Sequence, residues 1–355
     1  MRIENDVKLD FSDVLIRPKR SSLNSRKEVE LERTFKFKYS PHTWTIVPIV
    51  ASNMDTTGTF EMAKALHRQG MATALHKQYT GLEYEKFINR KYETIEVESL
   101  LNNVFVSIGS NSKDLHKVKI PLKHINKIMI DIANGYSEHF IDCIKRTRDA
   151  YPEHIICAGN VVTADMAEAL ILAGADIVKA GIGNGSVCTT RLLTGIGYPQ
   201  LSAVIECADA VHGLDGHLMS DGGCNTPADF AKALGAGADF IMSGSYFAGH
   251  DESGCEKHVD EETGELFLKY YGMSSNTAQE KHNGGVNDYR SSEGRTVLIP
   301  YKGPVQYACK NLLGGLRSTC TYVGASTIKQ LPKRTTFIRV NNTHNRVYES
   351  NTIRL

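Results

Sequence analysis

A cysteine follows a glycine-rich stretch near the middle of the 355-residue sequence. An apolar run over residues 177–180 leads into Gly181, Gly183 and Gly185, and the stretch ends at Cys188. Glycine lets the backbone adopt positive φ and approach a ligand closely. Because nearby positive charge and amide N–H groups favour a thiolate, Arg191 and the loop amides would make Cys188 a nucleophile. A buried, inert thiol is the alternative that the motif alone leaves open.

Glycines also follow two later apolar runs. Asp221-Gly222-Gly223 comes after residues 217–220, and Gly244-Ser245 comes shortly after residues 239–242. Backbone N–H groups of such turns bind phosphate near helix starts, so we expect a phosphate site here, with a tight turn as the alternative. If phosphate binds, the Asp221 carboxylate would accept hydrogen bonds from ribose hydroxyls instead. The carbonyl groups of the Cys188 loop could in turn ligate a monovalent cation.

Eight short apolar runs recur along the chain, with helical patterns between them. This alternation predicts parallel strands joined by crossover helices, and eight repeats predict an α/β fold, a closed (β/α)8 or TIM barrel. The predicted strands are 48–51, 71–75, 104–108, 127–132, 154–158, 176–180, 217–220 and 239–242. Active sites of such barrels lie at the C-terminal ends of the strands. Since these ends are polar or glycine-rich, we expect one polar mouth that includes Cys188.

The predicted helices carry their own start and stop signals. Thr163 is a predicted N-cap for a helix that stops at Gly174, and Thr226-Pro227 opens another helix in the same way. Pro199 opens a third, whose apolar residues at helical spacing are Leu201, Val204, Ile205 and Ala208. Residues 172–178 and 234–241 resemble each other, each being a helix end followed directly by a strand.

Two regions stand outside the repeat. Residues 1–45 form an N-terminal extension that we expect to wrap or cap the barrel. Residues 246–304 are polar and glycine-rich, with a predicted hairpin at 258–271. A long insertion at this end of a barrel strand is typical of a lid. We therefore predict a single domain over residues 1–355, without an inserted regulatory domain.

Composition and charge exclude several classes of protein. With 41 basic and 40 acidic side chains, the chain has no bias toward nucleic acid or a membrane surface. The longest apolar run, near residues 46–51, is too short to span a bilayer, and the first residues do not form a secretory signal. No two of the eight cysteines have C-x-x-C spacing. We expect a cytoplasmic protein whose other thiols are buried and reduced.

The segment around Cys188 closely resembles the catalytic loop shared by IMP dehydrogenases and GMP reductases. Further matching segments cover essentially the whole chain, at residues 13–16, 53–55, 158–161, 197–200, 220–223, 271–274 and 314–318. The reductase branch is favoured by segments 7–9, 17–21, 131–137 and 333–340. Only about 30 residues separate the second and third predicted strands, which is a normal connection and leaves no room for the regulatory domain of dehydrogenases.

The resemblance implies an activity in purine salvage: NADPH-dependent conversion of GMP to IMP, with release of ammonia. In this family Cys188 would attack C2 of the purine and form a covalent thioimidate, while Thr190 and Glu293 would supply the proton for the departing amine. Splitting one difficult displacement into two easier steps is the advantage of covalent catalysis. A lid would keep water from hydrolysing the intermediate.

The resemblance also implies a set of binding residues and a homotetramer. Contacts with GMP or IMP are implied for Ser186, Asp221, Gly222, Gly223, Gly244, Ser245, Gly272, Met273, Ser274, Arg290, Ser291, Ser292 and Gly294. Contacts with NADPH are implied for Lys77, Asp131, Ile132, Ala133, Ile182, Gly183, Tyr289, Ser318, Thr319, Cys320 and Thr321, and for Ser25 and Arg26 reaching a neighbouring subunit's cofactor. A potassium-type site is implied at Gly183, Gly185, Cys188 and Arg191.

Three positions depart from the family pattern. Asn184 replaces a proline between the loop glycines, Ala180 replaces a valine, and Ser245 replaces a glycine. Loss of the proline frees φ, so the rigidity of the loop and its need for a cation depend on what holds Asn184. Two other functions stay open: an IMP dehydrogenase using NAD and water, and a catalytically silent nucleotide sensor. The intact Cys188, Thr190 and Glu293 favour an enzyme over a sensor.

Overall fold

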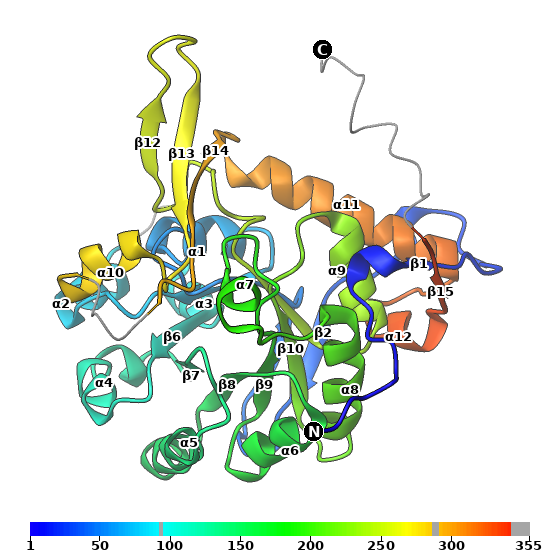
Figure 1. The fold of residues 1–355 in the computed structure, drawn as a ribbon, viewed down its shortest axis with the longest axis horizontal. Coiled ribbons are helices and arrows are strands. Elements are labelled where there is room, and N and C mark those ends of the chain that lie inside the picture. The colour runs from blue at the N-terminus through cyan, green and yellow to red at the C-terminus, as the bar shows by residue number, and fades with distance from the viewer. Residues whose placement is uncertain (92–94, 286–290, 342–355) are drawn as a thin grey trace.

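The computed structural model describes residues 1–91, 95–285 and 291–341. At its centre is a closed barrel of eight parallel strands, in the order β4 to β11 with β11 pairing back onto β4 (Figure 1). The strands are β4 Ile49–Ala51, β5 Ala72–Leu75, β6 Val104–Ile108, β7 Lys127–Asp131, β8 Ile155–Val161, β9 Ile177–Ala180, β10 His217–Asp221 and β11 Phe240–Ser243. The predicted α/β barrel and its eight strands are confirmed.

The barrel interior is filled by apolar side chains that all eight strands contribute. Phe105, Met129, Ile177 and Phe240 belong to one buried cluster, together with aromatic residues of the hairpin β2 (Arg33–Lys36) and β3 (Thr43–Ile46). Trp44 of this hairpin stacks on Phe240 with ring centroids 5.5 Å apart. Part of the N-terminal extension therefore closes the base of the barrel, opposite the predicted mouth.

Helices surround the barrel, and the two threonine caps predicted from the sequence have different outcomes. Thr226 forms a capping box with Asp229 at the start of α9, whereas the Thr163 side chain does not cap α6 but contacts the Tyr136 hydroxyl at 3.0 Å. The helices are α1 Phe60–His67, α2 Gly81–Ile88, α3 Val97–Leu101, α4 Ser112–Lys117, α5 Glu138–Ala150, α6 Ala164–Leu172, α7 Thr190–Thr194, α8 Gln200–His212, α9 Pro227–Gly235, α10 Asn276–Asn283, α11 Val305–Val323 and α12 Leu331–Arg334.

The predicted apolar face of α8 is wrong at one residue. Ile205 is 44% exposed, whereas Ala203 and Cys207 are buried. The buried stripe is rotated toward these two small side chains because α8 packs closely beside α6, and small residues permit that approach.

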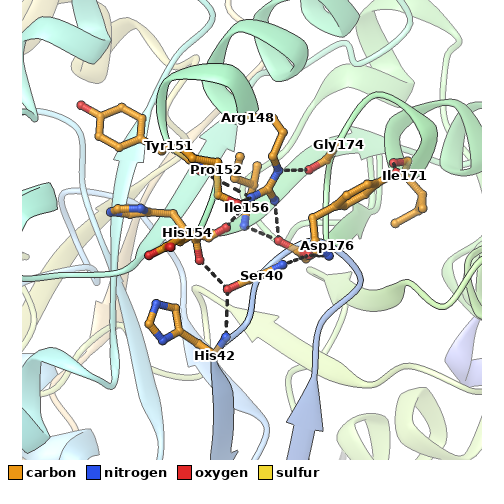
Figure 2. A network of polar contacts seen from close by, with 12 residues as sticks. Ser40, His42, Arg148, Tyr151, Pro152, His154, Ile156, Ile171, Gly174 and Asp176 are labelled. Atoms are coloured by element: carbon orange, nitrogen blue, oxygen red, sulfur yellow. Dashed lines mark hydrogen bonds and ion pairs between the residues drawn. The ribbon is translucent and has the colours of Figure 1, made fainter.

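The two similar segments of the sequence place an aspartate at equivalent positions before β9 and β11. Asp176 accepts a hydrogen bond from the Ile156 amide of β8 and pairs with Arg148, whose guanidinium also donates to the His154 and Gly174 carbonyls (Figure 2). Asp239 likewise accepts from the Leu218 amide of β10 and pairs with an arginine, Arg33. These two buried acids hold the base of the barrel together.

The long insertion after β11 forms a three-stranded antiparallel sheet and α10. β12 Glu256–Val259 and β13 Leu266–Tyr271 form the predicted hairpin, which projects away from the barrel in Figure 1. β14 Thr296–Pro300, which the sequence analysis did not predict, pairs with β13. Near the termini, β1 Val14–Ile16 pairs with β15 Phe337–Arg339. Within the described ranges, every helix is too short or too polar to cross a membrane.

Candidate active site

Cys188, Thr190 and Glu293 form a hydrogen-bonded chain at the mouth of the barrel. The Cys188 Sγ lies 3.2 Å from the Thr190 Oγ1, and this hydroxyl donates to the Glu293 Oε2 at 2.8 Å. Since the single hydroxyl proton of Thr190 points to the carboxylate, the thiol donates its own proton to Thr190. The geometry connects the half-buried sulfur to a carboxylate through one hydroxyl, although more than 100 residues separate Thr190 from Glu293.

The insertion reaches this site through backbone pairing with the cysteine loop. The Thr189 amide donates to the Glu293 carbonyl and the Arg295 amide to the Val187 carbonyl, both at 3.0 Å, and Cys188 bridges Gly294 in antiparallel fashion. A strand-like segment of the insertion therefore lies directly against the nucleophile. This pairing, rather than a side-chain contact alone, fixes the Glu293 carboxylate beside Thr190.

Two glycines are required where these segments meet. A Cβ on Gly272 would lie 2.9 Å from the Val187 carbonyl oxygen, and a Cβ on Gly294 would lie 2.9 Å from the Ser275 nitrogen. Both distances are shorter than side chains tolerate, so any other residue would push the insertion away from the cysteine loop. The turn 272–274, which the resemblance implied for substrate contact, is thereby held near the nucleophile.

Arg295 is a residue of this site that the sequence analysis missed. Its guanidinium donates twice to the Ser186 carbonyl, with distances of 3.1 Å from Nε and 2.7 Å from Nη2. Ser292 contributes on the same segment by donating to the Gly294 carbonyl at 3.0 Å. The only local signal for Arg295 was its place directly after Glu293-Gly294.

The two glycine turns after β10 and β11 lie side by side. Gly222 and Gly223 have φ values of +81° and +77°, which favour glycine, and the Ser245 hydroxyl donates to the Asn225 Oδ1 at 2.5 Å, joining the two loops. The Gly222 amide already donates to the Met242 carbonyl. A phosphate would therefore draw on other amides of these turns.

Asn184 replaces the conformational restriction of the missing proline with a hydrogen bond. Its Nδ2 donates to the Asp221 carbonyl at 2.8 Å, and the neighbouring Gln200 Nε2 donates to the Ala180 carbonyl at 2.9 Å. Gly181 packs so closely that a Cβ there would lie 2.2 Å from the same Asp221 oxygen. The cysteine loop is thus fastened to the end of β10.

A buried lysine, also missed in the sequence, connects the implied cofactor and substrate sides. Lys179 of β9 forms ion pairs with Asp131 at the end of β7 and with Asp221 at the end of β10, the second at 2.7 Å. Burial alone would lower the pKa of Lys179, but the two carboxylates raise it well above its usual value. Burial would raise the pKa of Asp131, and the Lys179 ammonium holds it below its usual value.

Of the other residues implied for NADPH, Ile132 and Ala133 follow β7, Ile182 and Gly183 follow β9, and the rest that the structure describes lie in two groups. Lys77 lines a small cavity with Tyr84 and Ser107, whose buried hydroxyls have no partner among the described residues. The second group lies along α11, where the short helix Arg26–Glu28 packs beside the segment that holds 318–321. The Cys320 side chain points into the core. Tyr289 and Arg290 lie outside the described residues.

A second network, also unpredicted, fastens the insertion to the end of β4. The Asp55 Oδ2 accepts from the Tyr271 hydroxyl at 2.6 Å and contacts the His282 Nε2 at 2.7 Å, and the Lys281 ammonium lies 3.2 Å away. Burial would raise the pKa of Asp55, but these partners lower it. Burial also lowers the pKa of the nearby His76 to about 4. Asp55 therefore stays ionised as an anchor for β13 and α10.

Comparison with known proteins shows the family of this chain. The model of the IMP dehydrogenase / GMP reductase domain matches residues 8–352. The chain is 57% identical over 353 residues to proteins named GMP reductase from Citrobacter koseri and Escherichia coli O81, covering 99% of this chain and 100% of each relative. A Shigella boydii relative of the same name matches to the same extent. The chain belongs to the IMP dehydrogenase / GMP reductase family.

Proposed function

We propose that this protein is an NADPH-dependent oxidoreductase that converts GMP to IMP and releases ammonia. Family membership and similarity to GMP reductases over the full length of those relatives support the assignment. The observation that carries it is the chain from Cys188 through Thr190 to Glu293, which supplies a nucleophile together with a route for its proton.

The proton route serves two steps: it accepts the thiol proton during attack on C2, and it returns a proton to the departing amine. As the Cys188 sulfur bonds to C2 of the purine, its proton passes to Thr190, and the hydroxyl proton passes to Glu293. The C2–N bond then breaks with its electron pair on the amine, and the same route in reverse protonates this leaving group. Ammonia departs and leaves a thioimidate between Cys188 and the purine. NADPH, when bound, supplies the hydride that replaces the amine at C2, and the sulfur leaves as thiolate.

The insertion protects this intermediate from water. Gly294 lies against Cys188, and Gly272 approaches the Val187 carbonyl too closely for a side chain or solvent to intervene. Exclusion of water matters because hydrolysis of the thioimidate would give XMP instead of IMP. Residues 271–285 and 291–295 would therefore form part of the catalytic site as well as a cover over it.

The mouth offers a matching site for the nucleotide. Asp221 would accept hydrogen bonds from the ribose hydroxyls, and the joined turns at Gly222-Gly223 and Gly244-Ser245 would hold the phosphate. Ser186, the turn Gly272-Met273-Ser274, and Ser291, Ser292 and Gly294 lie on segments that surround the cysteine. Arg290 would complete this set.

NADPH and a monovalent cation would bind to further groups around the mouth. The orphaned hydroxyls of Ser107 and Tyr84 beside Lys77 suit a polar ligand, and residues 131–133 and 182–183 follow β7 and β9, the two strands that flank β8. Residues 318–321 would also contact NADPH, and Ser25 and Arg26 would reach the cofactor of a neighbouring subunit in a homotetramer. Carbonyl oxygens of Gly183, Gly185, Cys188 and Arg191 are the kind of donor that potassium takes.

A pair of assays tests the proposed function. The enzyme is incubated with GMP and NADPH, and separately with IMP and NAD, while nicotinamide absorbance and nucleotide products are followed. We expect IMP, ammonia and oxidised cofactor only in the first mixture. IMP oxidation alone would assign the chain to the dehydrogenase branch, and GMP binding without turnover would make it a sensor.

A further inference from the structure

Lys179 lies between two carboxylates that the proposed function assigns to different ligands. Asp131 ends β7 on the NADPH side, and Asp221 ends β10 on the GMP side. The Lys179 ammonium pairs with both, and its residue is only 2% exposed. One buried cation is therefore shared by the two halves of the site.

Asn160 holds the carboxylate on the GMP side, Asp221, and does not contact the one on the NADPH side. Its Nδ2 donates to the Asp221 Oδ2 at 2.9 Å and to the Gly181 carbonyl at 2.7 Å. Lys179 approaches the same Asp221 Oδ2 at 2.7 Å. The second carboxylate oxygen, Oδ1, accepts no hydrogen bond from the residues that the structure describes and can accept one from a ligand, whereas Oδ2 is held by both Lys179 and Asn160. This fixes the orientation of the acceptor that the ribose hydroxyls would meet.

The buried ammonium also sets the charge that each ligand meets. Two carboxylates this close to one cation leave one net negative charge between the NADPH and GMP sides. Without Lys179 the same space would hold two unneutralised acids, and their repulsion and desolvation would displace one carboxylate or protonate it. Both ligand sites would then lose a correctly placed acceptor.

We propose that Lys179 is a positioning residue that holds Asp131 and Asp221 in place for NADPH and GMP at the same time. This inference rests on the proposed function for the identity of the two ligands. Lys179 itself need not touch either ligand, because it acts through the two carboxylates. Asn160 is a second positioning residue that acts on Asp221 alone.

Three variants of the full-length protein separate this role from a general effect on folding. Lys179→Met removes the charge and keeps the length of the side chain. Asn160→Ala removes one contact of Asp221 and none of Asp131. Lys127→Met is the matched control, because Lys127 is also fully buried but contacts amide oxygens of Asn102 and Asn126 at the opposite end of the barrel.

Calorimetry measures the dissociation constants of IMP and NADPH, each ligand added alone. Steady-state assays give kcat and the KM values for GMP and NADPH, and thermal unfolding measures stability. We expect Lys179→Met to weaken both ligands by about tenfold or more, as expected for loss of one partner of a buried charge pair. Asn160→Ala should weaken IMP by about fivefold or more and leave NADPH within about twofold. Lys127→Met should leave both constants within about twofold.

Distinct results overturn distinct claims. A folded Lys179→Met enzyme that binds both ligands like wild type would refute the proposal. Equal weakening of IMP and NADPH by Asn160→Ala, or by Lys127→Met, would also contradict it, since the effects would then be general. If Lys179→Met does not fold, Asn160→Ala provides the test: weaker binding of IMP with unchanged binding of NADPH supports the proposal, and equal weakening of both ligands contradicts it. Failure of the wild-type protein to reduce GMP while it still binds IMP would instead overturn the proposed function.

Discussion

The barrel buries one lysine near each end, and the two lie in opposite environments. Lys179 at the mouth pairs with two carboxylates, which raise its pKa above the usual value even though burial opposes this. Lys127 at the base contacts two amide oxygens and the face of Trp44, 4.7 Å from the ring centroid. Burial lowers the pKa of Lys127 to about 7.

The difference shows which end of the molecule is built to meet charged ligands. At the mouth, the buried charge of Lys179 is compensated by two carboxylates that border the proposed ligand sites. At the base, buried polar groups bond to one another, as Asp176 and Arg148 do (Figure 2). Other buried groups there pack against aromatic rings. Substitutions at the mouth should therefore change catalysis and binding, and substitutions at the base should change stability.

Cys188→Ala carries the largest expected effect. Removing the sulfur abolishes the covalent step, so turnover should fall by at least about a thousandfold, while IMP binding and thermal unfolding stay near wild type. Single-turnover measurements with GMP and NADPH check this. Residual activity above a few per cent of wild type would identify another nucleophile.

Glu293→Gln should have the next largest effect. The amide keeps a hydrogen bond to Thr190 but cannot accept the thiol proton, so kcat should fall by about a hundredfold or more. Ammonia release, followed in a rapid quench, should slow more than the hydride step. Equal slowing of both steps would contradict a proton-transfer role.

Asp176→Ala tests the base of the barrel. Asp176 is fully buried, and its loss leaves the Arg148 guanidinium without its charge partner, so the free energy of unfolding should fall by about 3 kcal/mol. Denaturant unfolding measures this change. The kcat of the folded fraction should stay within about twofold of wild type. A selective loss of kcat would break the division between the two ends.

The pH dependence of stability gives the smallest change, expressed per pH unit, and separates the two lysines. The pKa of Lys127 is lower in the folded than in the unfolded chain, so the unfolded chain binds the extra proton between pH 7 and pH 10.5. The contribution of Lys127 to stability therefore rises with pH across this window, by at most about 1.4 kcal/mol per pH unit. We expect Lys127→Met to flatten this slope in unfolding experiments. An unchanged slope would show that Lys127 does not titrate there.

The features that could be predicted from the sequence are those encoded by residues close together in the chain. Short apolar runs predicted the strands closely. The glycines before Cys188 predicted the loop that carries the nucleophile. The links of Lys179 to Asp131 and Asp221 were missed because each joins residues more than 40 positions apart, and only the closed barrel brings them together. Arg295 and the Asp55 network were missed for the same reason. Thr163 and Ile205 behave unexpectedly because their tertiary neighbours, Tyr136 and α6, override local cap and periodicity signals.

Mass spectrometry of the intact enzyme, quenched shortly after mixing with GMP alone, tests the central claim most directly. We expect a covalent adduct whose added mass equals that of GMP less ammonia, located on the peptide that contains Cys188 and absent from Cys188→Ala. An adduct on another residue, or wild-type turnover by the Cys188→Ala enzyme, would contradict the account.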